Sequence, residues 1–246
     1  MLEGTDREPL IIPADKESII ENICTRPSAV DWDRDGELDL VVGNFAGSFY
    51  VFTGEGQGRF LPEPKQIMTD NGPLKIQGHH SDPFPVDWDN DGDIDLVSGS
   101  SAGGVQWAEN AARAGEAPAL EPFRDLIKPG QRIQYGEPLG EDELTGPTGS
   151  TRVWVDDVNA DGKLDVLVGD SVTLAAVANG LTKEELDKKQ SQWQDDLAKV
   201  SEEYRAAAGD QQKLQEYSAK IQKLHAQRAE FIKEDRTGFV WLYLQE

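Results

Sequence analysis

The sequence predicts an all-β fold of repeated antiparallel units, interrupted once by an antiparallel α-helical hairpin. Three observations support this prediction. A nine-residue Asp-rich pattern occurs three times, beginning at Asp31, Asp87 and Asp157. Each copy is followed by a short apolar run that ends in Gly, which is typical of a buried strand. Between residues 176 and 236 the apolar residues recur instead at heptad spacing, which predicts helices.

Each repeat predicts its strands in the same order. In the first repeat we expect strands at 28–30, 40–43, 48–52 and within 60–69. In the second repeat we expect them at 84–86, 95–99, 105–107 and near 123–127. The second strand of each repeat is apolar at nearly every position, so both of its faces should be buried between neighbouring units.

The third repeat is interrupted after its second strand at 166–170. Thr182 and Glu185 have the spacing of a capping box, and apolar residues then follow at heptad spacing as far as Phe231. We interpret this stripe as a coiled-coil seam between two helices; the alternative is an exposed arm that binds a partner. The expected division is repeated units in 1–175, an inserted hairpin in 176–236 and the returning strand of the third repeat in 237–246.

The Asp-rich loops carry oxygen ligands at alternate positions, then a Gly, then one more Asp. Calcium takes six to eight oxygen ligands in flexible geometry, and the Gly allows the chain to bend sharply. The seventh residue can offer its backbone carbonyl, so its side chain is free to vary. The expected ligand residues of three calcium sites are Asp31, Asp33, Asp35, Glu37 and Asp39; Asp87, Asp89, Asp91, Asp93 and Asp95; and Asp157, Asn159, Asp161, Lys163 and Asp165.

Other interpretations of these loops fit less well. An EF-hand closes with a Glu at position twelve, where this chain has Val42, Ser98 and Val168. Zinc prefers Cys and His ligands, and magnesium prefers fewer protein ligands and more water. Turns without metal remain an alternative, although several carboxylates in one tight turn would then repel one another.

The pattern Asp-x-Asp/Asn-x-Asp-Gly-x-x-Asp, followed by an apolar strand and Gly, resembles the FG-GAP (VCBS-type) repeat of integrin-α-like calcium-binding β-propellers. In that family the calcium loop joins the first two strands of a propeller blade. The resemblance covers roughly residues 20–175 and implies β-propeller-type blades. The segment Asn44-Phe45-Ala46-Gly47 comes near the Phe-Gly part of the motif, whereas residues 99–103 lack the Phe.

Three blades are recognisable, whereas propellers close with four to eight. Residues 8–13 read as an outer strand that precedes the first blade. Three alternatives follow: the chain belongs to a larger propeller, a second copy completes the ring, or residues without the motif form further blades. Self-association through open blade edges or through the helical hairpin is expected on the same grounds.

Charge and composition limit the kinds of partner that the chain is expected to bind. The net charge of −22 argues against nucleic acid and against anionic membranes. Cys24 is the single cysteine, so no intramolecular disulfide forms, and no apolar stretch approaches the ~20 residues of a membrane span. The first residues lack the pattern of a signal peptide. Calcium loops are useful where calcium is abundant, so an exported location (periplasmic, cell surface or secreted) is expected.

No catalytic residues or further cofactors are expected. The chain contains no phosphate loop, nucleophile elbow or His-Glu-x-x-His motif, and His79-His80 is interpreted as a polar turn rather than as an acid–base pair. The expected function is a calcium-stabilised binding or adhesion module that recognises protein or carbohydrate. The alternative is a calcium-dependent polysaccharide lyase or hydrolase on a propeller scaffold, which a basic or tyrosine cluster away from the loops would favour.

Overall fold

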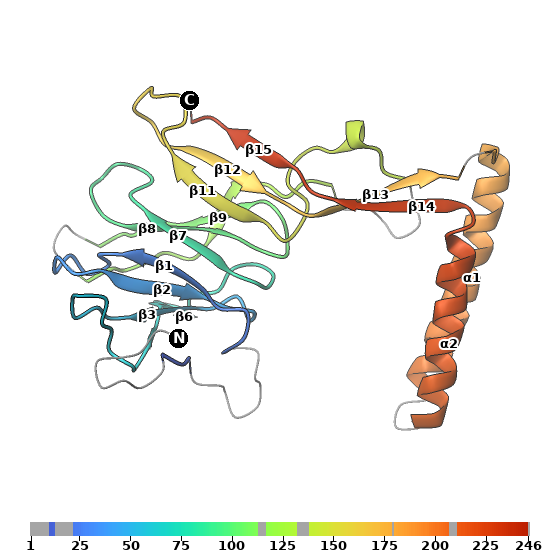
Figure 1. Ribbon diagram of the computed structural model, residues 1–246, viewed down its shortest axis with the longest axis horizontal. Helices are drawn as coiled ribbons and strands as arrows, with labels where there is room; N and C mark the ends of the chain where they lie inside the picture. The colour runs from blue at the N-terminus through green and yellow to red at the C-terminus, as the bar shows by residue number, and fades with distance from the viewer. Residues whose placement is uncertain are drawn as a thin grey trace. The chain divides into compact units, whose positions relative to one another are not determined.

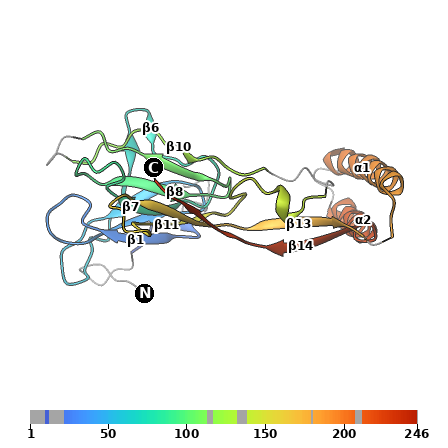
Figure 2. The ribbon, with the colours of Figure 1, turned by 90° about the horizontal axis from the view of Figure 1, so that it is seen from above.

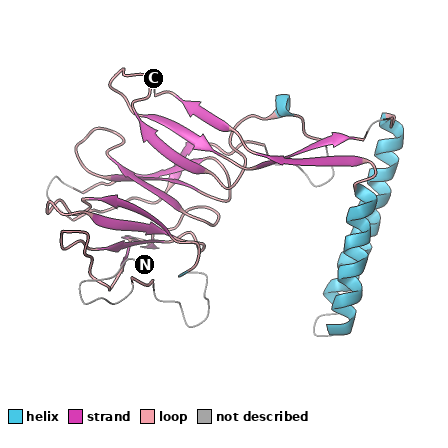
Figure 3. Ribbon diagram, in the orientation of Figure 1, coloured by secondary structure: helices cyan, strands magenta, loops and turns pink. Residues whose placement is uncertain are grey.

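The fold is mostly β, with several antiparallel sheets and two helices (Figure 3). The computed structural model describes residues 10–12, 22–112, 117–131, 138–178, 180–206 and 211–245. Of these, the residues before 132, those from 145 to 172 and those from 238 onward form one compact unit; the others form a second. The mostly antiparallel β architecture and the presence of two helices are confirmed. The expected outer strand at 8–13 lies largely outside the described residues.

Three sheets repeat one topology, with consecutive strands as hydrogen-bonded neighbours in sheets 1 and 2. Sheet 1 contains β1 (Arg26–Val30), β2 (Asp39–Gly43), β3 (Phe49–Phe52) and β4 (Lys65–Gln66). Sheet 2 contains β7 (Asp82–Val86), β8 (Asp95–Gly99), β9 (Val105–Ala108) and β10 (Arg124–Ile127). Sheet 3 contains β11 (Arg152–Asp156), β12 (Asp165–Gly169) and β15 (Val240–Tyr243). The short strands β5 (Met68–Thr69) and β6 (Gly72–Pro73) pair with each other.

The sheets share a register as well as a topology. In each sheet the first residue of the first strand pairs with the Gly that ends the second strand: Arg26 with Gly43, Asp82 with Gly99, and Arg152 with Gly169. The last residue of the first strand pairs with the Asp that closes the Asp-rich loop. The three loops therefore occupy equivalent positions, each at the same end of its own sheet.

Strand β7 lies next to both β1 and β11, so the first strands of the three sheets are side by side (Figures 1 and 2). One apolar core contains Val41, Phe49 and Leu96 and joins sheets 1 and 2. A second core contains Val97 and Val166 and joins sheets 2 and 3. Every residue of β2 and β8 is buried, in agreement with their apolar sequences. The described sheets stack in sequence but form no closed barrel.

The Gly at the end of the second strand is required by close packing. A Cβ at Gly43 would lie 2.5 Å from the carbonyl oxygen of Ser81, and one at Gly99 would lie 2.4 Å from that of Thr151. In both cases the chain entering the next sheet crosses directly over the Gly. At Gly169 nothing in the described structure lies within 4 Å of that position. The apolar run therefore ends in Gly where the following sheet packs against it.

The second compact unit contains the helices and a two-stranded ribbon. The ribbon pairs β13 (Val172–Val177) with β14 (Ile232–Thr237), and the helices are α1 (Lys183–Ala206) and α2 (Gln211–Arg228). The 3₁₀ turn η2 (Glu141–Glu143) also belongs here, because Leu139 pairs with Ala175. The helical part is thus shorter than the expected range 176–236, and strands flank it on both sides.

Two sequence features of the helices have clear structural counterparts. Thr182 and Glu185 form a reciprocal capping box, with the Thr182 N–H donating to Glu185 Oε2 at 2.9 Å and the Glu185 N–H donating to Thr182 Oγ1 at 3.3 Å. Trp193 is buried against Leu224 and donates its indole N–H to the Leu224 carbonyl at 2.8 Å. The apolar stripe therefore forms the seam between the helices.

Removal of the helices should leave the Asp-rich loops intact. The N–H of Ala178 donates to the carbonyl of Phe231 at 3.0 Å, so the chain ends left by excision are already adjacent. Replacing residues 179–230 by a short Gly-Ser turn should preserve the β signal in circular dichroism and calcium uptake by calorimetry. Excising only residues 200–217 is the control, because it retains the contact between Trp193 and Leu224. Loss of the β signal in the longer excision alone would show that the helices support the sheets.

Candidate metal centre

The three Asp-rich loops adopt the same tight coil. The first Asp of each loop accepts a hydrogen bond from the N–H of the sixth-position Gly: Asp31 from Gly36 at 3.1 Å, Asp87 from Gly92 at 3.0 Å and Asp157 from Gly162 at 2.9 Å. The φ angles of these glycines are 93°, 96° and 87°, a region that favours Gly. The fourth residue of each loop is also left-handed. The Gly in the motif is therefore required by the backbone.

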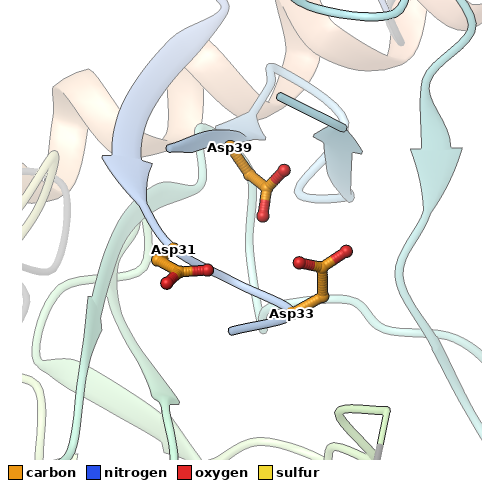
Figure 4. Close-up of side chains that lie close together, drawn as sticks. All are labelled: Asp31, Asp33 and Asp39. Atoms are coloured by element: carbon orange, nitrogen blue, oxygen red, sulfur yellow. The ribbon is translucent and has the colours of Figure 1, made fainter. Parts of the chain in front are cut away.

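This coil brings carboxylates together in the first two loops. One carboxylate oxygen from each of Asp31, Asp33 and Asp39 lies within 4.8 Å of the others (Figure 4). In the second loop the trio is Asp87, Asp89 and Asp91, so the fifth-position Asp stands where the first loop has the ninth-position Asp. Figure 4 shows the three side chains of the first loop facing a common space. In each of these two loops, three of the five expected ligand residues thus have carboxylate oxygens close together.

The third loop differs because Asn159 replaces an Asp. Its amide nitrogen donates to Asp161 Oδ2 at 3.0 Å, and its amide oxygen accepts from the Asp161 N–H at 2.9 Å. Within the described ranges, no comparable trio of carboxylate oxygens forms in this loop. The amide therefore occupies an oxygen of Asp161 that was expected to serve as a ligand.

Unpartnered oxygens show that a cation fits the first two loops. Asp31 Oδ1, Asp87 Oδ1 and Asp93 Oδ1 are buried and, among the described residues, have no hydrogen-bond partner. A buried acceptor without a donor is costly, and a carboxylate more so than a neutral group. A hard divalent cation with a preference for oxygen would supply the missing partner. The donor set suits calcium and offers neither the sulfur nor the nitrogen that zinc prefers.

Burial also raises the pKa values of several carboxyl groups in the first two loops. Burial, followed by repulsion from neighbouring carboxylates, raises the pKa of Asp33 and of Asp93. Burial also raises the pKa of Asp89, and it raises that of Asp95 to about 6, although backbone N–H groups of Asn110 and Trp88 oppose the second shift. Without a cation, the fold therefore holds these groups in surroundings that disfavour their charged form.

The seventh-position side chains have no shared role. In all three loops the backbone N–H of this residue donates to the fifth-position Asp, at 2.8 Å for Glu37, 3.0 Å for Asp93 and 2.9 Å for Lys163. Of the three side chains, Asp93 is buried whereas Glu37 and Lys163 are exposed. The exposure of Glu37 and Lys163 agrees with a contribution through the backbone, whereas Asp93 in addition has the buried, unpartnered oxygen Oδ1.

The ninth-position Asp has a role that the sequence did not indicate. Each of these carboxylates is at most 1% exposed and accepts two backbone hydrogen bonds, an arrangement that we call the carboxylate clasp. Asp95 accepts from the Trp88 N–H at 3.1 Å and from the Asn110 N–H at 2.7 Å. The clasp ties the loop to the chain just beyond the third strand of the same sheet. The partners are backbone groups, so no sequence pattern marks them.

The same clasp occurs in the other two sheets. Asp39 accepts from Trp32 and Gly54, and Asp165 accepts from Val158 and Gln245. The partner beyond the third strand is 15 residues away in sheets 1 and 2 but 80 residues away in sheet 3. Residues 173–237, the larger part of the second compact unit, are therefore inserted between the loop and the third strand without changing the clasp.

A second polar group, which we call the Arg-Asp-Arg cluster, lies at the opposite ends of the first strands. Arg26, Asp82 and Arg152 are the first residues of β1, β7 and β11. Asp82 Oδ1 is 3.7 Å from Arg26 Nη1 and 3.9 Å from Arg152 Nε. Each member stands five residues before the first Asp of its loop, but the sequence did not mark the cluster because the residue at this position changes from Arg to Asp and back to Arg.

Comparison with known proteins agrees with the geometry of the loops. A family model described as FG-GAP-like repeat matches residues 31–98, which include the first two loops. The chain is 26% identical over 148 residues to cartilage acidic protein 1 of Xenopus tropicalis. The alignment covers 59% of this chain and 20% of that protein, so the chain spans about a fifth of that relative. No solved structure gives a significant match.

The match to FG-GAP-like repeats associates the chain with properties that are common among proteins with such repeats. FG-GAP repeats are often calcium-binding, they suggest a protein-binding or adhesion-type module, and they are typical of extracellular proteins. In the portion of the chain that the structure describes, neither helix has the length and apolar character needed to cross a membrane.

Proposed function

This chain is an FG-GAP repeat protein, and from that premise we propose that it is a calcium-stabilised binding or adhesion module. It recognises protein or carbohydrate, performs no chemistry of its own and works outside the cytoplasm. The observation that carries the proposal is the pair of buried, unpartnered oxygens, Asp31 Oδ1 and Asp87 Oδ1, inside two clusters of carboxylates. Calcium is abundant outside cells, where such sites would be filled.

Each loop would hold one ion through its own oxygens. The ligand groups are the side chains at the first, third, fifth and ninth positions and the backbone carbonyl at the seventh. A bound ion supplies positive charge that offsets the repulsion among these carboxylates. The clasp at Asp39, Asp95 and Asp165 leaves each carboxylate with remaining acceptor capacity, because each oxygen can accept more than one bond.

The three sheets would be propeller-type blades. Their shared register, and the side-by-side placement of β1, β7 and β11, support this interpretation. Sheet 3 presents exposed apolar side chains at Val240 and Leu242 of β15. A further blade, or a second copy of the chain, would pack against this strand and continue the stack.

Calcium titration tests the proposal. Calorimetry of calcium-stripped protein should show three binding events, the weakest at the third loop, because affinity follows the number of ligand charges and Asn159 removes one. The Asn159→Asp variant should tighten that site by roughly tenfold, since it adds a carboxylate and removes the amide donor to Asp161.

The matched control is Asn71→Asp, the same chemical change at an exposed position outside the loops. It should leave all three affinities unchanged. Absence of calcium uptake by the wild-type protein would overturn the proposal. Release of calcium from the third loop last, as the ion is withdrawn, would show that charge count does not rank the sites.

A polysaccharide lyase or hydrolase is the second candidate, and the Arg-Asp-Arg cluster is the observation that favours it. Guanidinium groups can neutralise the carboxylate of an acidic sugar, and His80 lies two residues before Asp82. Release of unsaturated sugar ends or of new reducing ends from acidic polysaccharides would support this candidate over a binding module.

A further inference from the structure

The same left-handed backbone conformation precedes each residue of the Arg-Asp-Arg cluster. Cys24, His80 and Ser150 have left-handed φ angles of 55°, 60° and 50°, and each stands two residues before the first residue of its strand. Non-glycine residues adopt this conformation uncommonly and at an energetic cost. All three repeats accept this cost at the same position, so the chain enters β1, β7 and β11 in the same way.

The Arg-Asp-Arg cluster has a net positive charge, because its two arginines face a single carboxylate. Two guanidinium groups face one carboxylate, and both approach the same oxygen of Asp82 at more than hydrogen-bond distance. Arg26 Nε is buried and has no hydrogen-bond partner in the described structure. Arg152 directs Nη1 to the Thr151 carbonyl at 2.9 Å, which holds the guanidinium in place. The side chains of Arg26 and Arg152 are 27% and 40% exposed, so the solvent-facing part of each guanidinium group, rather than the buried Arg26 Nε, can reach a second carboxylate.

The surroundings keep this site polar without cancelling its charge. Burial, followed by the charges of Arg26 and Arg152, lowers the pKa of His80, which favours the neutral imidazole. Burial raises the pKa of Asp82, and the two arginines offset that rise only in part. The Asp-rich loops begin after the far ends of the same five-residue strands, roughly 16 Å away. An anion at the cluster would thus lie well away from the proposed cations.

Aromatic side chains adjoin the cluster. Side chains two residues apart on a strand point to the same side. Trp154 is therefore on the same side of β11 as Arg152, and Phe84 is on the same side of β7 as Asp82. The two rings lie 5.4 Å apart between centroids with an interplanar angle of 70°, and Trp154 is 59% exposed. An exposed aromatic face beside guanidinium donors suits a ligand with an apolar ring face and an attached carboxylate.

We propose that the Arg-Asp-Arg cluster binds the carboxylate of a uronate residue in an acidic saccharide, with Trp154 against the sugar ring. The assignment rests on the proposed binding function and names its ligand. An acidic peptide would supply the carboxylate but not the rigid ring that Trp154 can cover. A neutral saccharide would supply the ring but leave the guanidinium groups without a new acceptor.

The test is a titration of the full-length, calcium-loaded chain with a galacturonate trimer, followed by calorimetry and by tryptophan fluorescence. We expect saturable binding, a change in fluorescence, and no binding of a neutral galactose trimer. Arg26→Gln and Arg152→Gln should each weaken binding tenfold or more. Arg59→Gln, the same loss of charge at an exposed site outside the cluster, should leave binding unchanged. Arg152→Lys should bind with intermediate affinity, because it keeps the charge but loses the planar donors.

Calcium uptake separates failure of this assignment from failure of the proposed function. If the protein takes up calcium but does not bind the galacturonate trimer, the saccharide assignment is wrong and the calcium-stabilised module stands. Equal binding of the trimer by wild type and by the Arg26→Gln, Arg152→Gln double variant would also overturn it. Binding of a glutamate-rich peptide in place of the saccharide would overturn it in favour of a protein ligand.

Discussion

The Asp95→Ala variant is expected to melt roughly 5–20 °C below the wild type even when calcium is absent. Substitution removes the acceptor of two backbone N–H groups, those of Trp88 and Asn110, in the interior of sheet 2. Each buried donor left unsatisfied costs about 1–3 kcal/mol, and each kcal/mol lowers the melting temperature by about 2–4 °C in a protein of this size. The loss arises in the fold itself and needs no metal.

Asp89→Ala is the matched control for this expectation. Asp89 is an exposed member of the same loop and, among the described residues, accepts one long bond, from the Asp91 N–H at 3.3 Å. Thermal melts should show a small effect of Asp89→Ala without calcium and a clear loss of stability with it. If the two variants behave alike in calcium-free buffer, the carboxylate clasp does not stabilise the fold.

Calcium is expected to reverse the pH dependence of stability. In calcium-free protein the pKa of Asp95 is raised to about 6, and those of Asp33, Asp89 and Asp93 are raised in the same direction. The folded state then binds protons more tightly than the unfolded state, so these groups stabilise the fold below pH 4. Asp95 loses that contribution as the pH rises through about 6, and the other three lose theirs as the pH rises above 4. With calcium, protons compete with the ion, so stability should fall as the pH falls.

The separation between the two conditions should be largest near neutral pH. An ion present at 1,000 times its dissociation constant stabilises the fold by about 4 kcal/mol per site. Two filled loops would raise the melting temperature by roughly 15–30 °C. Melts of calcium-stripped protein between about pH 4 and pH 7, with added calcium or with sodium at equal ionic strength, measure the difference. Parallel curves would show that these carboxylates do not bind calcium.

The loops could be predicted from sequence because their chemistry is local. Gly36, Gly92 and Gly162 lie in the left-handed region for which the motif requires them, and the first Asp of each loop bonds to them across five residues. The mostly antiparallel architecture also follows from local patterns of apolar residues. Short-range information was therefore sufficient for these features.

Other features depend on contacts that the sequence does not encode locally. Strand β14 is polar at most positions, since it belongs to a two-stranded ribbon, and so it lacked the apolar pattern by which strands are recognised. The carboxylate clasp joins side chains to backbone groups, and the Arg-Asp-Arg cluster joins residues from three repeats. These features emerge only when the sheets are stacked.

The 80-residue span of the clasp in sheet 3 has a consequence for the order of folding. Closing a flexible loop of 80 residues costs about 1.5 kcal/mol more chain entropy than closing one of 15 residues. Sheets 1 and 2 can therefore join their third strands early, whereas β15 must wait. Once β13 pairs with β14, the chain on either side of the helices is brought together and most of that extra entropy has already been lost. We therefore expect the inserted segment to fold before the third sheet closes.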